Sequence, residues 1–201
     1  MTKILHIDTS SSLEPSTSRQ LTEYLVNKLT QSPGNLVTKR DLGKMPIPHI
    51  DEHTVQAFYQ PEETHSEEAA VASKRSENLI GELLDHDIIV LGVPMYNYTI
   101  PSPLKAYIDH VARPGYTFNF TPTGFEGLIK NKRVIVIITR AGALTDSIDN
   151  HQEPYLKTIF SFLGIENVTF IIAENLINEP DKKATISQAR SQINDIVAQE
   201  D

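Results

Sequence analysis

Two polar loops of this chain carry the residue types that bind ligands. The first, residues 9–18, is rich in serine and threonine, and the second, residues 94–98, reads Pro-Met-Tyr-Asn-Tyr. Hydroxyl groups beside a helix N-terminus can hold a phosphate through neutral hydrogen bonds and the helix dipole. A flat apolar wall with amide donors suits a planar heteroaromatic ring. Together the loops indicate a ligand that has a monophosphate group and a flat ring.

Each loop also has a simpler interpretation. Serine and threonine clusters before a helix often serve only as helix caps, and the aromatic side chains of the second loop could pack on a neighbouring helix. The first loop has neither Gly-x-Gly-x-x-Gly nor Gly-Lys-Ser, so it is not a dinucleotide fingerprint or a P-loop. A phosphate would therefore be bound there without lysine or arginine.

Other motifs restrict the chemistry further. The chain has 0 cysteines, which excludes disulfides, thiolate metal sites and the cysteine nucleophile of phosphatases on a similar topology. His49, Glu52 and His53 spell His-x-x-Glu-His, a zinc-peptidase pattern that needs both rings on one helix. Because prolines 46 and 48 precede it, residues 46–63 are predicted to be an irregular surface segment, and we expect no metal site.

The elements that must position the loops follow from hydrophobic periodicity. Strands are predicted over 3–8, 36–42, 88–94, 133–138 and 168–173, of which 36–42 has the mixed pattern of an edge strand. Helices are predicted to begin near 16–18, where Thr17 and Gln20 form a capping-box pattern, and over 66–84, 102–113, 155–163 and 184–198. In the second of these helices, Val71, Leu79, Ile80, Leu83 and Leu84 are the expected apolar contacts. Residues 116–120 and the turn at 121–124 predict a small projecting ribbon.

This alternation of strands and helices predicts an α/β protein with a parallel sheet between two helical layers, as one domain over residues 1–201. Two doubly wound strand orders are candidates. Five strands with a phosphate-type loop after the first suit the flavodoxin-like order 2-1-3-4-5. In that order strands one, three and four are neighbours, so the loops at 9–18, 94–98 and 139–142 converge on one crevice.

The composition is that of an ordinary globular protein, with 39% hydrophobic and 22% charged residues. The net charge of −8 argues against a broad nucleic-acid or anionic-membrane surface. No segment is long and apolar enough to span a membrane, and the first residues lack a signal-peptide pattern. We therefore expect a cytoplasmic enzyme or binding protein.

One stretch of sequence is much more specific than these patterns. Val-Pro-Met-Tyr-Asn-Tyr at 93–98, followed by Pro-x-Pro-Leu-Lys-x-Tyr-Ile-Asp at 101–109, resembles the FMN-dependent NADH azoreductase and quinone reductase family. The resemblance extends over nearly the whole chain, through the segments 16–18, 115–118, 124–128, 154–156 and 162–165. It implies a flavodoxin-like fold and a homodimer with FMN bound at the subunit boundary.

The resemblance also implies roles for individual residues. The FMN phosphate would be held by Ser10, Ser16, Thr17 and Ser18. The flavin ring would lie against Pro94, Met95, Tyr96, Asn97 and Tyr98, with its pyrimidine end near Thr139, Arg140, Ala141 and Gly142. The substrate side would be covered by Phe120 and Phe162 of the partner subunit.

This chain departs from the family pattern in two places. Many relatives have Ser-Arg-Gly-Gly where this chain has Thr139 to Gly142, and some have an aromatic residue or histidine near Leu144. Alanine has less backbone freedom than glycine. The departures therefore bear on flavin contacts and substrate preference at the third loop.

The activity that the resemblance implies is a ping-pong cycle in which NADH or NADPH reduces the flavin and a quinone or azo compound reoxidises it. The cofactor carries the chemistry, water can supply the protons, and no catalytic acid or base is expected. The alternative is a flavodoxin-like electron carrier or FMN-binding regulator without enzymatic activity. The projecting ribbon and the aromatic pair favour the enzyme, because a carrier needs no covered substrate pocket.

Overall fold

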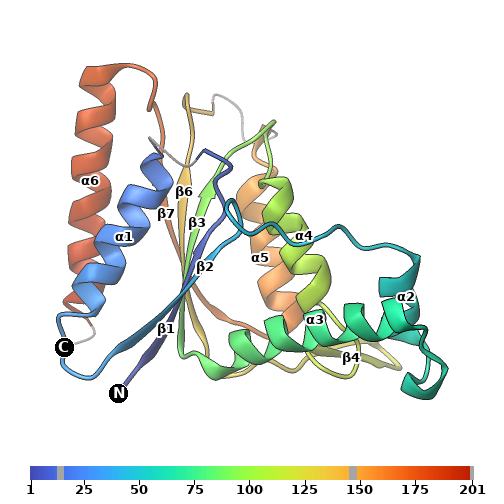
Figure 1. Ribbon diagram of the computed structural model, residues 1–201. Helices are drawn as coiled ribbons and strands as arrows, with labels where there is room; N and C mark the ends of the chain where they lie inside the picture. Colours follow the sequence, from blue (N-terminus) through green and yellow to red (C-terminus); the bar gives the residue numbers. More distant parts are fainter. Residues whose placement is uncertain (13–15, 145–148, 200–201) are drawn as a thin grey trace.

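Five parallel strands form the central sheet of the computed structural model, which describes residues 1–12, 16–144 and 149–199. Its strands are β1 (Lys3–Asp8), β2 (Leu36–Asp41), β3 (Ile88–Pro94), β6 (Arg133–Thr139) and β7 (Asn167–Ala173). They are ordered β2-β1-β3-β6-β7, and every neighbouring pair is parallel (Figure 1). In chain order this is 2-1-3-4-5, so the predicted sheet is confirmed.

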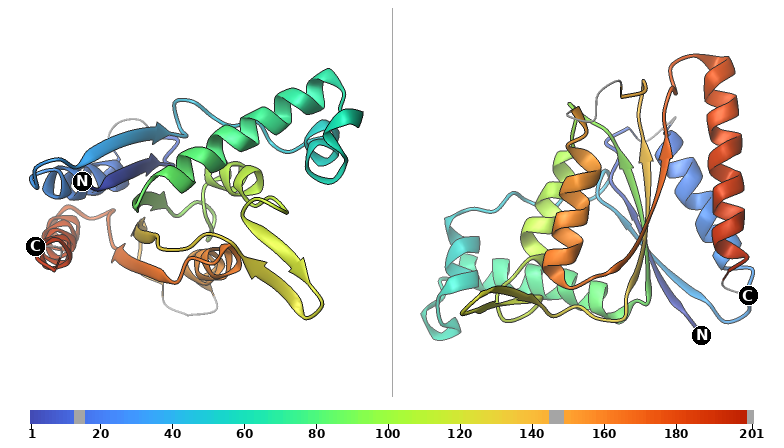
Figure 2. Two further views of the ribbon diagram at one scale, coloured as in Figure 1. Left: turned by 90° about the horizontal axis from the view of Figure 1, so that it is seen from below. Right: turned by 180° about the vertical axis from the view of Figure 1, so that it is seen from behind.

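Helices cover both faces of the sheet (Figures 1 and 2). On one face lie α1 (Thr17–Leu29) and α6 (Glu179–Val197), and on the other lie α3 (Glu67–Asp85), α4 (Ser102–Val111) and α5 (Gln152–Leu163). The two central strands β3 and β6 are buried almost throughout, whereas the edge strand β2 is mostly exposed. Apolar runs buried on both faces are typical of parallel sheets, which is why the sequence identified these strands well.

Three details of the helices differ from the sequence prediction. Residues 46–63 are not irregular throughout, because they contain α2 (Glu52–Tyr59) and the short 3-10 helix η1 (Glu62–Thr64). Asp51 caps α2 by accepting a hydrogen bond from the Thr54 amide at 2.9 Å, but α2 has only 8 residues, too few for hydrophobic periodicity to identify a helix. Helix α6 begins five residues before the predicted start, since a proline in the first turn is compatible with a helix.

The predicted contacts of α3 were partly wrong. Leu79, Ile80 and Leu83 are buried, but Val71 and Leu84 are 59% and 41% exposed. Ala69 and Ala72 instead fill the N-terminal half of the helix face, where α2 packs closely on α3. The close packing of the two helices leaves room only for small side chains there. Hydrophobicity alone therefore misidentified the buried face of α3.

An antiparallel hairpin formed by β4 (Phe118–Thr121) and β5 (Gly124–Gly127) projects from the body of the molecule, as predicted (Figure 2). Its return strand is anchored at the C-terminus of α5, where the Ile129 amide donates to the Leu163 carbonyl at 2.9 Å. Gly164 ends α5 with φ of 91°, in the left-handed region. A Cβ on Gly164 would lie 2.7 Å from the Gly127 carbonyl oxygen, so two glycine backbones must meet there.

No helix within the described ranges 1–12, 16–144 and 149–199 is long and apolar enough to cross a membrane.

We expect Gly164→Ala to lower the free energy of unfolding by about 2 to 3 kcal/mol, because it combines left-handed strain with a backbone clash. Urea denaturation followed by circular dichroism measures this change. Gly81→Ala is the matched control: Gly81 lies in the exposed interior of α3 with nothing near its would-be Cβ. That substitution should instead raise stability by up to about 1 kcal/mol. Equal effects of the two substitutions would contradict the argument.

Candidate functional site

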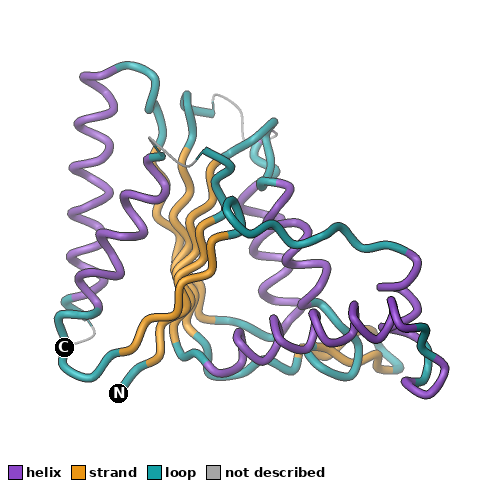
Figure 3. The backbone as a smooth tube through the Cα atoms, viewed as in Figure 1, coloured by secondary structure: helices purple, strands orange, loops and turns teal. Residues whose placement is uncertain are grey.

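The loops that follow β1, β3 and β6 lie together at the carboxyl edge of the sheet (Figure 3). The hydroxyl of Tyr96 lies 3.3 Å from Ser10 Oγ and accepts a hydrogen bond from the Ser11 amide at 3.2 Å. The Met95 amide donates to the Thr139 carbonyl at 2.8 Å. The convergence of the three loops is therefore confirmed, except that residues 13–15 of the first loop lie outside the described part of the chain.

The N-terminus of α1 is not capped in the way the sequence predicted. The N-cap residue is Ser16 rather than Thr17, and its backbone is extended. Ser16 makes no side-chain cap hydrogen bond, and its Oγ instead lies 3.1 Å from Ser18 Oγ. The first amides of a helix have no partner within the helix. Within the part of the chain that the structure describes, no side-chain cap occupies these donors, so they and the helix dipole are available to an anion, which favours the phosphate interpretation over the simple cap.

The second loop holds a strained turn. Tyr96 and Thr99 exchange backbone hydrogen bonds of 3.0 and 3.1 Å around Asn97 and Tyr98. Those two residues have φ of 50° and 67°, in the left-handed region. Such backbone is costly for residues other than glycine and gathers at functional sites. Tyr98 is 57% exposed, so its side chain is not packed on a neighbouring helix, as the simpler interpretation of this loop requires.

The third loop presents its backbone rather than its arginine. The Arg140 side chain is buried, and its guanidinium donates to Glu174 Oε1 at 2.5 Å and to Asn150 Oδ1 at 3.0 Å. These bonds connect the end of β6 to the segments that precede α5 and follow β7. Arg140 therefore directs its guanidinium to these neighbouring segments, whereas Ala141 and Gly142 are exposed. Leu144 is described and partly exposed, and the next four residues lie outside the described part.

Phe120 and Phe162 lie together, but not beside these loops. Four phenylalanine rings form one cluster: the centroid of Phe162 is 4.5 Å from that of Phe118 and 5.3 Å from that of Phe125, which in turn lies 5.6 Å from Phe120. The cluster sits where the hairpin meets the C-terminal end of α5 (Figure 1). Since α5 runs opposite to the parallel strands, this is the end of the sheet remote from the loops. Phe120 is 63% exposed.

Sequence analysis overlooked Phe125, which is 61% exposed and pairs directly with Phe120 across the hairpin. The hairpin register could have revealed it. A two-residue turn at Pro122 and Thr123 sets Phe120 opposite Phe125, and such cross-strand neighbours lie within contact distance. The aromatic patch is therefore larger than the pair that the family resemblance implied.

A buried ionic cluster beneath the first loop was also overlooked. Arg19 forms a two-pronged bond with Asp41, at 2.6 and 2.8 Å, and its Nη1 lies 3.3 Å from Asp8 Oδ2. Asp8 also contacts Lys39 Nζ at 3.1 Å and His6 Nε2 at 3.2 Å. The available signal was an aspartate at the end of each of two neighbouring strands and an arginine in the first turn of α1, but the aspartates lie 11 and 22 positions from the arginine. Pairing across that distance is invisible to local pattern.

The environment of Asp8 favours its charged form. Burial alone would raise the pKa of Asp8, but hydrogen bonds and charge attraction from His6 and Lys39 outweigh burial and lower the pKa from 3.8 to about 2. A carboxylate whose pKa is lower in the folded state stabilises the fold at pH values above its unfolded pKa. That stability is lost as pH falls through the folded pKa.

We therefore expect the wild type to lose about 2 kcal/mol of stability through Asp8 between pH 4 and pH 2. Because other carboxylates titrate in the same range, the measurement compares the wild type with Asp8→Asn. The difference between their free energies of unfolding, taken from urea titrations, should be constant above pH 5 and shrink toward pH 2. A difference that stays constant down to pH 2 would show that Asp8 is not held in its charged form.

The His-x-x-Glu-His pattern does not have the geometry of its zinc-site namesake. Helix α2 begins at Glu52, so His49 precedes the helix and its N-cap residue Asp51. The two imidazoles therefore do not project from successive turns of one helix, as the pattern requires. Among the described residues, no group of three or more histidine and acidic side chains is placed to hold a metal ion.

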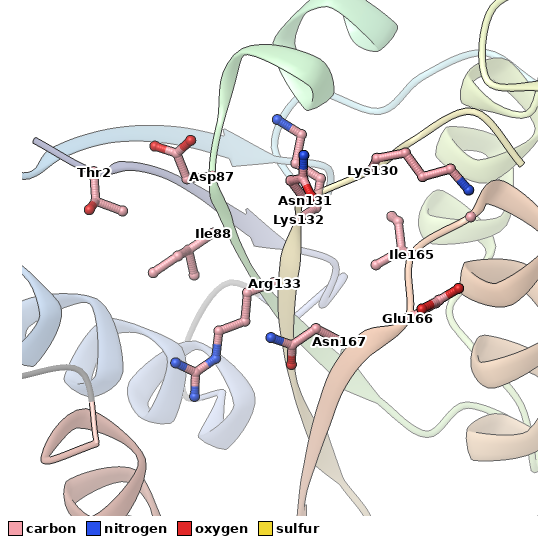
Figure 4. Close-up of a pocket in the computed structure, with 11 residues that line it drawn as sticks. Thr2, Asp87, Ile88, Lys130, Asn131, Lys132, Arg133, Ile165, Glu166 and Asn167 are labelled. Atoms are coloured by element: carbon pink, nitrogen blue, oxygen red, sulfur yellow. The ribbon is translucent and has the colours of Figure 1, made fainter.

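A hollow of about 560 Å³ lies at the opposite, amino edge of the sheet (Figure 4). Lys130 and Lys132 line it together with the acidic Asp87 and Glu166, so its charge is mixed. The ammonium of Lys132 is already bonded to the Leu84 carbonyl at 2.6 Å. Ligands of open parallel sheets bind beyond the carboxyl ends of the strands. The three loops, rather than this hollow, are therefore the candidate site.

Comparison with known proteins agrees with this arrangement. A family described by its flavodoxin-like fold matches residues 2–197. The FMN-dependent NADH:quinone oxidoreductase 2 of Pseudomonas putida is 41% identical over 196 residues, which are 96% of this chain and 98% of that protein. The chain belongs to the FMN-dependent NADH:quinone oxidoreductase family. Another member, from Azotobacter vinelandii, is 45% identical over 177 residues, 88% of this chain and 89% of its own.

Two solved structures have folds similar to that of this chain. The azoreductase from Bacillus anthracis str. Sterne superimposes with a TM-score of 0.90 at 26% identity, covering 99% of this chain and 100% of that one. An FMN-dependent NADH-azoreductase from Bacillus anthracis str. Ames Ancestor in complex with FMN has a TM-score of 0.88 at 24% identity, covering 99% of each chain, and supports the fold. The family and the flavodoxin-like fold expected from the sequence are both confirmed.

Proposed function

We propose that this protein is an FMN-dependent oxidoreductase that transfers hydride from NADH or NADPH to quinones and reductively cleaves aromatic azo compounds. The observation that carries the proposal is the link between the first two loops. The Tyr96 hydroxyl joins the hydroxyl-rich first loop, at Ser10 and Ser11, to the strained aromatic turn of the second loop. One loop offers donors to a phosphate and the other a flat wall to a ring, which are the two ends of FMN.

The residues of the site divide the cofactor between them. The phosphate is proposed to bind at Ser10, Ser16, Thr17 and Ser18. The ring is proposed to lie against Pro94, Met95, Tyr96, Asn97 and Tyr98, and its pyrimidine end against the backbone of Thr139, Arg140, Ala141 and Gly142. The uncapped amides of α1 and the left-handed pair in the second loop fit these two groups.

When bound, FMN supplies the electron chemistry, taking a hydride from the nicotinamide donor and passing it to the acceptor. The chain would hold the flavin ring in place and bind its polar edge. The amides of Tyr96 and Thr99 bond to each other's carbonyls within the turn, so the amides of Asn97 and Tyr98 would be the ones to meet the ring. Backbone donors of the exposed residues Ala141 and Gly142 would stabilise negative charge at its pyrimidine end. No side chain acts as acid or base, because water delivers the protons of the quinol.

The aromatic cluster is proposed to cover the ring of a second copy of the chain. Within one chain, Phe120 and Phe125 are remote from the loops and 63% and 61% exposed. An exposed aromatic patch of this kind marks an interaction surface. A homodimer that brings the hairpin of each subunit over the loops of the other would cover both the patch and the ring. The exposed third loop leaves space for a quinone or azo substrate between them.

The rival function is a flavodoxin-like electron carrier. A carrier exposes the edge of its flavin to protein partners and has no use for four clustered rings on a projecting hairpin. The proposed enzyme works in the cytoplasm, where reduced nicotinamide nucleotides are available. Its electron acceptor is a small molecule. The enzyme binds neither nucleic acid nor membrane, in keeping with the net charge of −8.

The purified protein should be yellow and release FMN alone on denaturation. With varied NADH and quinone, its steady-state rates should give parallel double-reciprocal lines, because the donor leaves before the acceptor binds. A protein that takes up no added FMN would overturn the proposal. A flavin-loaded protein that does not oxidise NADH or NADPH would favour the carrier.

Phe120→Ala should lower kcat/KM for a quinone on the order of 10-fold, since it removes an aromatic contact worth about 1.4 kcal/mol. The FMN dissociation constant should change much less, because the phosphate and ring loops of the other chain hold the cofactor. Leu36→Ala is the control, because Leu36 is also large and exposed (51%) but lies at the amino end of the edge strand. A loss of FMN binding in Phe120→Ala, or the same kinetic loss in the control, would contradict the proposed role.

The same variant tests the shared site. Thr17→Glu should abolish FMN binding by placing a carboxylate where the phosphate binds. Each variant alone has low activity, but a mixed dimer contains one site with an intact loop from one chain and an intact phenylalanine from the other. Subunit exchange should therefore restore activity above the mean of the two parents. No gain on mixing would show that Phe120 acts within its own chain.

A further inference from the structure

The guanidinium of Arg19 is fully occupied beneath the first loop. Besides its bonds to Asp8 and Asp41, Nη2 donates to the Ser10 carbonyl at 2.7 Å and Nε to the Ser12 carbonyl at 3.2 Å. A guanidinium has five N–H groups, and these five bonds use all of them. Arg19 is 12% exposed and follows directly after Ser18. It therefore lies next to the proposed phosphate site without a donor left for the phosphate.

The bond to Ser10 fixes the direction of a neighbouring donor. The Ser10 carbonyl and the Ser11 N–H belong to one planar trans peptide group, so they point in opposite directions. Because Arg19 holds the carbonyl on one side, the N–H must point to the other side, where it meets the Tyr96 hydroxyl. The Ser12 amide in turn donates to Ser10 Oγ at 3.2 Å. One arginine thus sets the orientation of successive peptides in the described part of the loop.

The turn after β2 has room for the contact between Arg19 and the Ser10 carbonyl. A Cβ on Gly43 would collide with the Ser10 carbonyl oxygen and lie 2.7 Å from Arg19 Nη2. Asp41, which binds Arg19 with both oxygens, also accepts hydrogen bonds from the Gly43 and Lys44 amides at 3.1 Å each. The turn after β2 is therefore built around the arginine, with a glycine where the loop carbonyl approaches.

We propose that Arg19 is a positioning residue that fixes the first loop in the conformation that recognises the phosphate of FMN, so that it determines the preference for FMN over riboflavin. This inference rests on the function proposed above. The ring loop has its own closure through the Tyr96 and Thr99 backbone pair. Loss of Arg19 should therefore weaken recognition of the phosphate much more than recognition of the ring.

The experiment measures dissociation constants of FMN and riboflavin by quenching of flavin fluorescence on the wild type and on Arg19→Lys. Lysine keeps the charge but cannot form the two-pronged bond or reach both carbonyls. FMN binding should weaken roughly 10- to 100-fold, which is the range seen when a residue that orients a metal ligand is removed. Riboflavin binding should weaken by less than about 3-fold. Gly43→Ala, which displaces the Ser10 carbonyl and leaves every charge in place, should produce the same selective loss.

Arg40→Lys is the matched control. Arg40 also forms a two-pronged bond with a carboxylate, to Glu82 at 2.9 and 3.0 Å, and it precedes Asp41 in the same strand. Its guanidinium contacts α3 rather than the first loop. A thermal melt of each variant checks that the substitutions are comparable in their effect on the fold. Arg40→Lys should leave the ratio of the two flavin dissociation constants unchanged.

The possible results separate the inference from the function beneath it. A selective loss of FMN binding in both Arg19→Lys and Gly43→Ala supports the inference. Equal losses of FMN and riboflavin, or no loss of either, overturn it, as does the same change of ratio in Arg40→Lys. If the wild type itself binds neither flavin, the proposed function fails instead.

Discussion

The parallel pairing of β1, β3 and β6 is the constraint on which the candidate site depends. Strands that run in one direction must all end at one edge, so three loops far apart in sequence are brought to the same place. The bonds from Tyr96 to the first loop and from Met95 to the third then fix their relative positions. Antiparallel pairing of any of these neighbours would send one loop to the other end of the molecule.

The arginine charges at this edge of the sheet are paired within the protein rather than exposed to solvent. Arg19 and Arg140, which belong to these loops or lie beside them, both direct their guanidinium groups to protein partners that include a carboxylate. Breaking a buried pair by removing one partner is strongly destabilising, because it leaves an uncompensated charge. The loops can therefore rely on neutral donors, hydroxyls and amides, whose directions are set by the ionic groups behind them.

Sequence reasoning succeeded where the signal was local and strong. The apolar runs of β3 and β6 and the glycine that ends α5 were identified because burial on both faces and a left-handed helix end leave clear marks in sequence. Once the strands were known, the convergence of the loops followed from topology. The family resemblance, by contrast, depended on one long motif beginning at Val93 and could not have been obtained from periodicity.

The failures have two physical origins. Where Arg140 and Arg19 direct their guanidinium groups depends on carboxylates that are distant in sequence. Helix α2 was missed because its 8 residues are too few for hydrophobic periodicity to identify a helix. The individual roles of the site residues stay predictions.

The projecting hairpin also has a consequence for the life of a newly made chain. Phe120 and Phe125 are 63% and 61% exposed within the single chain. Such rings can associate with other apolar surfaces. If a second copy covers them, as proposed above, pairing of two chains competes with aggregation, and the yield of folded protein then depends on Phe120 and Phe125 apart from the stability of the sheet.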